Sequence, residues 1–105
     1  MINRLEQLQK MLDGQPKDSF LNHATALEYS KIGEYEKAAS HFKIVIDNDP
    51  DYIGSYYHLG KVYESLRENA NALRTYEDGM IIAQKLGDTR TLSELNEAKS
   101  QLENV

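Results

Sequence analysis

The 105-residue sequence has no cysteine and no long apolar run. Without cysteine, disulfides, thiolate zinc sites and a thiol nucleophile are all excluded, and the composition fits a reducing compartment. The N-terminal stretch MINRLEQLQKMLDG is interrupted by Arg4, Glu6 and Lys10, so we expect neither a signal peptide nor a membrane span there. These absences predict a soluble cytoplasmic protein without membrane association.

Positive charge is also scarce, because 12 basic residues stand against 17 acidic ones and give a formal net charge of -5. Such a balance disfavours binding to the phosphates of a nucleic acid, and no basic cluster with interleaved aromatics overrides it. The length suits one domain that buries a continuous core.

Apolar residues recur at intervals of three and four along almost the whole chain, which is the spacing of helices that bury one face. One such stripe consists of Tyr56, Leu59, Gly60, Tyr63 and Leu66. No stretch alternates with a period of two for long. The pattern predicts an all-α fold of six helices without a sheet, in which short connections make sequential helices antiparallel neighbours.

Proline is rare, and its two occurrences are Pro16 in LDGQP and Pro50 in IDNDP, at an interval of 34. Shifting the chain by the same interval superimposes residues of similar size and chemistry well beyond the prolines. These pairs are Leu12 and Ile46, Asp13 and Asp47, Ala26 and Gly60, Tyr29 and Tyr63, Ala38 and Ala72, and Phe42 and Tyr76. The interval therefore indicates an internal repeat of two helices per unit.

The repeated residues follow the pattern W-x2-L-G-x2-Y, then A-x3-F, then P. One unit reads Tyr56-x2-Leu59-Gly60-x2-Tyr63 and Ala72-x3-Tyr76, and the other reads Asn22-x2-Thr25-Ala26-x2-Tyr29, Ala38-x3-Phe42 and Pro50. Over roughly residues 17–87 the chain resembles the tetratricopeptide repeat family. The resemblance implies antiparallel helix-turn-helix repeats in an α-α superhelix.

The resemblance also divides the chain, as a single domain over residues 1–105. Residues 1–16 correspond to the second half of a preceding unit, residues 17–50 and 51–87 to two repeats, and residues 88–105 to a capping helix. Ala26 and Gly60 are expected to be small so that the two helices of a unit approach closely. Asp18 and Asp51 lie where a helix N-cap is useful.

Two patterns raise metal or catalytic interpretations, and both are disfavoured. Asp47, Asp49 and Asp51 have the spacing of a calcium loop, but Pro50 intervenes and the glycine and glutamate of such a loop are missing. His23, His41 and His58 are not accompanied by carboxylates or thiols at ligand spacing. No catalytic constellation or nucleotide loop is evident, so we predict no metal, no cofactor and no enzymatic activity.

The remaining candidate site is a surface. In the family, the first helices of the units line a concave groove that binds peptides or helices. Aligning the two units places eight residues on that face: Phe20, His23, Leu27, Lys31, Tyr57, His58, Lys61 and Glu64. The alternative is that a neighbouring helix covers Phe20 and Leu27.

Some members of the family clamp the acidic tail of heat-shock chaperones with lysine and asparagine. Here those positions hold His23, Leu27 and His58, so that function is not expected. The resemblance implies a non-enzymatic adaptor that binds a protein or peptide partner. The alternative function is self-association into a homo-dimer through the terminal helices, which cover the exposed ends of a short array. Molecular mass across a dilution series separates the two.

Overall fold

The computed structural model describes residues 3–104, which form six helices and no strand. The helices are α1 (Arg4–Gly14), α2 (Ser19–Lys31), α3 (Tyr35–Asn48), α4 (Gly54–Ser65), α5 (Asn69–Leu86) and α6 (Thr89–Glu103). The prediction of an all-α fold with six helices is confirmed. Met1, Ile2 and Val105, which belong to the predicted half-unit and capping helix, lie outside the described residues.

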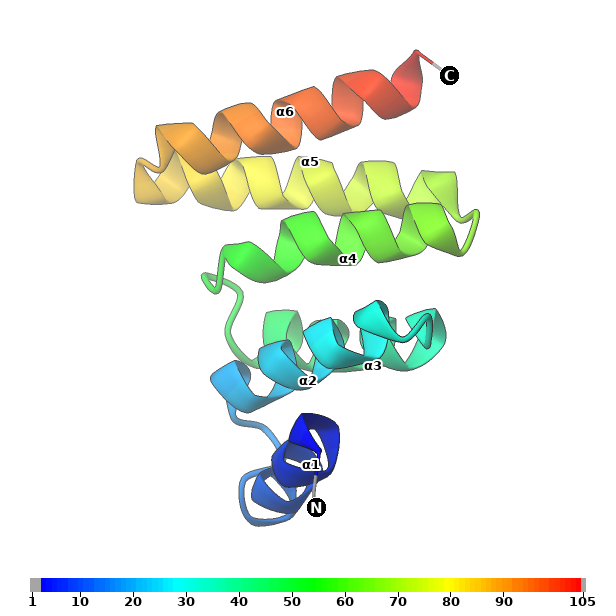
Figure 1. Ribbon diagram of the computed structural model, residues 1–105. Helices are drawn as coiled ribbons and strands as arrows, with labels where there is room; N and C mark the ends of the chain where they lie inside the picture. Colours follow the sequence, from blue (N-terminus) through cyan, green and yellow to red (C-terminus); the bar gives the residue numbers. More distant parts are fainter. Residues whose placement is uncertain (1–2, 105) are drawn as a thin grey trace.

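The helices stack in the order of the chain, from α1 at one end to α6 at the other (Figure 1). Each helix packs against the next, and α2 also contacts α4. The stack measures 44 × 28 × 19 Å. This order follows from the short connections, which place each helix beside the one that precedes it and the one that follows it.

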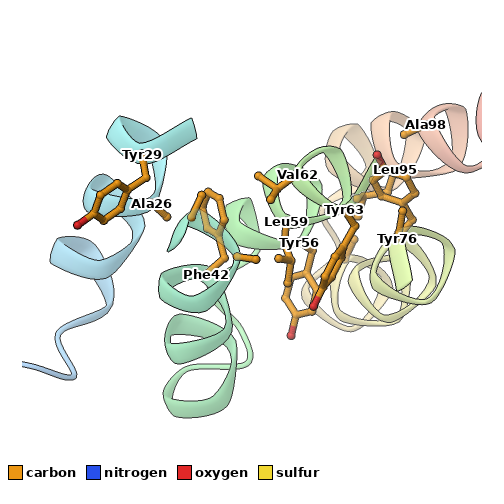
Figure 2. Packing of buried hydrophobic residues seen from close by; sticks show 14 residues of the cluster. Ala26, Tyr29, Phe42, Tyr56, Leu59, Val62, Tyr63, Tyr76, Leu95 and Ala98 are labelled. Atoms are coloured by element: carbon orange, nitrogen blue, oxygen red, sulfur yellow. The ribbon is translucent and has the colours of Figure 1, made fainter. Parts of the chain in front are cut away.

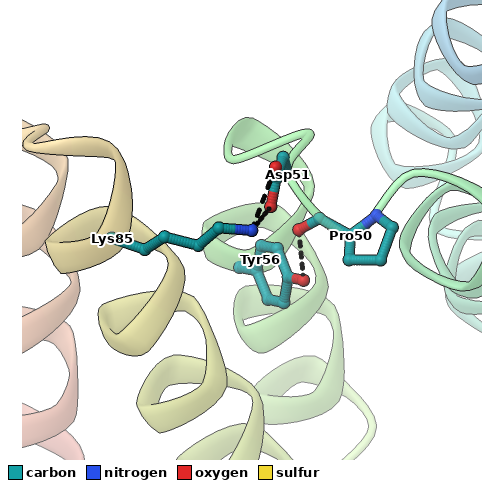
Figure 3. Close-up of polar contacts among 4 residues, drawn as sticks. All are labelled: Pro50, Asp51, Tyr56 and Lys85. Atoms are coloured by element: carbon teal, nitrogen blue, oxygen red, sulfur yellow. Dashed lines mark hydrogen bonds and ion pairs between the residues drawn. The ribbon is translucent and has the colours of Figure 1, made fainter.

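Two of the helix starts depend on aspartate, and one prediction about them is wrong. The Asp18 carboxylate accepts a hydrogen bond from the Leu21 backbone N–H at 2.8 Å, as an N-cap does. Asp88 caps α6 in the same way. Asp51 does not cap α4, because that helix begins only at Gly54. Its carboxylate instead pairs with the Lys85 ammonium at 3.1 Å (Figure 3).

The backbone carbonyl of each proline accepts a hydrogen bond from a side chain of the helix that follows. The Asn22 side-chain amide donates to the Pro16 carbonyl at 3.0 Å, and the Tyr56 hydroxyl donates to the Pro50 carbonyl at 2.6 Å (Figure 3). Asn22 and Tyr56 occupy equivalent positions of the two repeats. Each bond ties the first helix of a repeat to the turn before it and satisfies a backbone acceptor that has left the preceding helix.

The turn inside each repeat requires a left-handed residue directly after the C-cap of the first helix. Gly33 follows Ile32 with φ 78°, and Arg67 follows Leu66 with φ 61°. Gly33 and Arg67 occupy equivalent repeat positions, and glycine adopts this conformation without the steric cost that a Cβ brings. Gly87, with φ 70°, is the C-cap of α5.

Replacing Arg67 with glycine is therefore expected to stabilise the fold by about 0.5–1 kcal/mol. The relief of the left-handed strain, about 1–2 kcal/mol, exceeds the extra freedom that glycine gives to the unfolded chain. Urea denaturation measures the change. Gly33→Ala is the matched variant and is expected to destabilise by about 1 kcal/mol, so two shifts of the same sign would contradict the assignment.

The core runs through the stack between the helices (Figure 2). Gly60 is buried where α4 meets α5, and a Cβ at this position would lie 2.1 Å from the Cε1 atom of Tyr76. The two helices of this repeat, α4 and α5, thus approach each other closely at Gly60, as predicted. Gly79 makes a second one, since a Cβ there would lie 2.7 Å from that of Tyr56. The sequence pattern did not single out Gly79.

Candidate functional site

The four groove residues predicted from the first repeat come together at a hollow of about 480 Å³ beside α1 and α2, which we call the N-terminal hollow. It is lined by Arg4, Phe20, His23, Ala24, Leu27, Glu28, Ser30 and Lys31. Phe20 stays 62% exposed, so no neighbouring helix covers it, while Leu27 is half-buried against the core. The alternative that a neighbouring helix covers Phe20 is therefore wrong.

The charges around the N-terminal hollow largely satisfy one another. The Glu28 carboxylate lies 2.8 Å from the Lys31 ammonium and 4.0 Å from the Arg4 guanidinium. Arg4 comes from α1 and the other two from α2, so the trio joins the two helices across the hollow. The remaining lining is mainly apolar, which leaves space for a side chain of that kind.

A row of three rings, His23, His58 and Tyr57, leads from the N-terminal hollow across α2 and α4; we call it the aromatic row. The ring centroids of His23 and His58 are 5.6 Å apart, and those of His58 and Tyr57 are 5.7 Å apart. Both histidine rings also contact Phe42 of α3, and the His23 Nδ1 atom lies 2.8 Å from the Ser55 hydroxyl. The row therefore belongs to the packing between the repeats as well as to their surface.

Burial keeps the two histidines of the aromatic row uncharged at neutral pH. Burial and the nearby His58 ring lower the pKa of His23 from 6.5 to about 4. Burial also lowers the pKa of His58 below its ordinary value. Both shifts have the same cause, since a partly buried imidazolium loses hydration that the surrounding rings do not replace.

These shifts predict that acid destabilises the fold. The unfolded state binds protons below pH 6.5 while native His23 stays neutral down to about pH 4, so stability should fall as the pH drops through that window. Because the ring is only partly buried, we expect a loss of about 1–2 kcal/mol. Urea denaturation between pH 7 and pH 5 measures it, in a range that precedes most carboxylate titration.

The control for this prediction is His23→Phe, which keeps a ring in the row but removes its titration. This variant is expected to lose stability at all pH values, because the buried Ser55 hydroxyl loses its partner. Its dependence on pH should nevertheless be flatter than that of the parent. An equally steep dependence would assign the acid sensitivity to other groups.

Three of the groove residues predicted from the second repeat lie at or near a second hollow. This C-terminal hollow, of about 280 Å³, is lined by Tyr57, Lys61, Glu94, Glu97, Ala98 and Gln101. The Lys61 ammonium lies 5.6 Å from the centroid of the Tyr57 ring and 3.7 Å from the Glu64 carboxylate. Glu64 also accepts a hydrogen bond from the Tyr76 hydroxyl, so part of its role is structural.

Sequence reasoning missed the contribution of α6 to this hollow, because the last helix was interpreted only as a cap. A signal was present. Leu92 and Leu95 follow Tyr56 and Leu59 at an interval of 36, so α6 can be aligned with the first helix of a further unit, with Asn96 and Lys99 in place of Gly60 and Tyr63. First helices share the groove face, and this places Glu94 and Glu97 opposite Lys61.

Residues 3–104 hold no cluster of three or more histidine or acidic side chains that could bind a metal ion. His41 is separate from the aromatic row: its ring stacks on Tyr29, and its Nδ1 atom lies 2.8 Å from the Asn22 amide oxygen. Within the described part of the chain, no helix is both long and apolar enough to cross a membrane.

Comparison with known proteins also finds tetratricopeptide repeat proteins, although no family model matches the sequence. A tetratricopeptide repeat domain protein from Salinibacter ruber, solved by NMR, is 40% identical, with a TM-score of 0.80 over 86% of this chain and 91% of its own. A TPR repeat-containing protein of Pseudomonas aeruginosa is 29% identical over 91 residues, which are 87% of each chain.

A third relative shows the fold alone. The TPR2B domain of yeast Sti1, in complex with pHsp70, is 16% identical and has a TM-score of 0.88 over 95% of this chain and 80% of its own. The internal repeat, the packing of Gly60 against Tyr76 and the identity to the Salinibacter ruber protein all agree. The chain belongs to the tetratricopeptide repeat family.

Proposed function

We propose that this protein is a non-enzymatic adaptor that binds a peptide or helix of a partner protein. The groove consists of the eight residues of the sequence prediction: Phe20, His23, Leu27, Lys31, Tyr57, His58, Lys61 and Glu64. The observation that carries the proposal is Phe20, a large apolar side chain that is 62% exposed in a hollow of about 480 Å³. An exposed aromatic ring in a hollow is typical of a binding anchor.

The relatives support the class of function without naming the partner. The Sti1 domain was solved with pHsp70, and members of the family are generally protein-binding modules without catalysis. Recognition of an acidic chaperone tail is not part of the proposal. The clamp positions hold His23, Leu27 and His58, and the two histidines are neutral at pH 7 because burial lowers the pKa of each.

Self-association through the terminal helices is the alternative, and the residues at both ends speak against it. Arg4 of α1 stands where Ala38 and Ala72 stand in the two repeats, and Lys99 of α6, which aligns with Tyr63 at an interval of 36, pairs with Glu77 of α5 at 3.4 Å. Further helices would have to bury these charges. We therefore propose a monomer, for which sedimentation across a dilution series should give a constant mass.

The test compares two exposed apolar residues in different places. Phe20 is 62% exposed in the N-terminal hollow, and Ile81 is 63% exposed on α5, outside both hollows. Phe20→Ala and Ile81→Ala should both melt within about 0.5 kcal/mol of the parent, because each side chain is mainly in water. In pull-downs from cells of the native host, Phe20→Ala should weaken partner capture by about 2 kcal/mol and Ile81→Ala should not.

Equal capture by the two variants would move the binding site away from the groove. Tyr57→Ala is a poorer test of the same idea. Tyr57 is half-buried against the core and its ring centroid lies 6.5 Å from that of Tyr76, so its loss changes packing as well as binding.

A further inference from the structure

The two hollows differ in chemistry, and this difference specifies the partner. We propose that the bound segment has a large apolar side chain, which enters the N-terminal hollow, and a lysine or arginine, which enters the C-terminal hollow. The inference rests on the proposed function, since it assumes that the groove binds a segment of a protein. It adds the composition of that segment and the placement of its side chains along the stack.

The N-terminal hollow is suited to an uncharged side chain. Phe20, Ala24 and Leu27 provide its apolar lining. Its one carboxylate, Glu28, is already between Lys31 and Arg4. The lining carries a formal charge of +1 (Arg4 and Lys31 against Glu28), which repels a cationic side chain, whereas an apolar side chain removes exposed apolar surface from water.

The C-terminal hollow has the opposite character because acidic groups outnumber basic ones. Lys61 is its one cation, and the ammonium is 3.7 Å from Glu64, which lies outside the lining. Glu94 and Glu97 approach from α6; Glu94 pairs with Arg90 at 3.3 Å, and no ion pair of Glu97 is found within residues 3–104. The lining therefore carries a formal charge of -1 (one lysine and two glutamates).

The same hollow contains the Tyr57 ring, whose face holds a cation of the protein itself. The Lys61 ammonium lies over the ring of Tyr57 at 5.6 Å from its centroid. Carboxylates beside an aromatic face attract lysine and arginine through ion pairing and the ring quadrupole together. An acidic segment would instead meet Glu94 and Glu97 and be repelled.

The aromatic row of His23, His58 and Tyr57 joins the two hollows, so one segment can reach both. Its two histidines are uncharged at neutral pH and impose no sign of their own on the segment. About 12 extended residues span roughly 40 Å, which is close to the 44 Å length of the stack. A peptide of that size is therefore long enough to test the whole groove.

The experiment uses phage display. Peptides that bind the intact protein at neutral pH are selected from a library of random peptides of about 12 residues. We expect enrichment of peptides that combine a large apolar residue with lysine or arginine at a constant spacing. The best peptide, made synthetically, should bind Phe20→Ala and the double variant Glu94→Gln/Glu97→Gln about tenfold more weakly than the parent. The effect of the double variant should shrink in about 1 M salt, which screens exposed charges.

The matched control is Glu103→Gln, which removes a carboxylate from α6 outside both hollows and should leave affinity unchanged. Enriched acidic peptides that still lose affinity for Phe20→Ala would overturn this inference and leave the proposed function intact. So would apolar peptides that are insensitive to Glu94→Gln/Glu97→Gln. Peptides that bind Phe20→Ala as well as the parent, or an absence of enrichment, would overturn both.

Discussion

Replacing Gly60 with leucine is expected to cost about 3 kcal/mol of folding free energy, at the upper end of the range for overpacked cores. A Cβ at Gly60 would lie 2.1, 2.6 and 2.7 Å from three atoms of the Tyr76 ring. The ring cannot move aside easily, since Tyr76 is fully buried and its hydroxyl donates to Glu64. Leucine also improves helix propensity, but by less than about 1 kcal/mol, so the clash dominates.

Urea denaturation of Gly60→Leu measures this loss, with Gly14→Leu as the matched control. Gly14 ends α1, is exposed, and has no atom near enough to meet a Cβ. Leucine there should change stability by no more than about 0.5 kcal/mol. If the two variants unfolded at the same urea concentration, α4 and α5 would not approach each other at Gly60.

Truncating Tyr76 to alanine is expected to cost about 3–5 kcal/mol, as for other buried aromatic side chains. The relative accessibility of Tyr76 is 0%, and its ring fills the space that Gly60 leaves. Burial and the hydrogen bond to Glu64 also raise the pKa of its hydroxyl, so the group stays a donor. A loss of this size is a large part of the stability of a small domain.

Thermal and urea denaturation of Tyr76→Ala and Tyr76→Phe separate packing from hydrogen bonding. Tyr76→Phe keeps the ring and should cost only about 1 kcal/mol, because it removes one hydrogen bond to a carboxylate that water can reach. A Tyr76→Ala variant that unfolded together with Tyr76→Phe would show that the ring contributes little to the core.

The internal repeat explains why so much of the fold was predictable. Helix spacing is a local property, and the repeat interval aligns Gly60 with Ala26 and Tyr76 with Phe42 from the residue types alone. Both small residues are buried and both large rings are fully buried, as the repeat implied. Because each sequence signal occurs in both repeats, the predicted helices and their buried faces agree with the structure.

Contacts that depend on three-dimensional distance were not predictable. Asp51 lies near the start of α4 in sequence, yet the turn after Pro50 carries it toward Lys85, a residue of the next helix. The repeat aligns Asn22 with Tyr56, but their shared role was equally hidden, because an amide and a phenol look unrelated until both are seen to donate to a proline carbonyl.

By itself, the sequence determined the all-α class, the six helices and the face of the first helices on which a groove is proposed, because these follow from the period of apolar residues along one chain. Tertiary structure decided that Phe20 stays exposed, that Glu28 is held between Arg4 and Lys31, and that α6 brings Glu94 and Glu97 to Lys61. The reason is that exposure and charge balance depend on how neighbouring helices are placed in space, which the period within each helix does not specify.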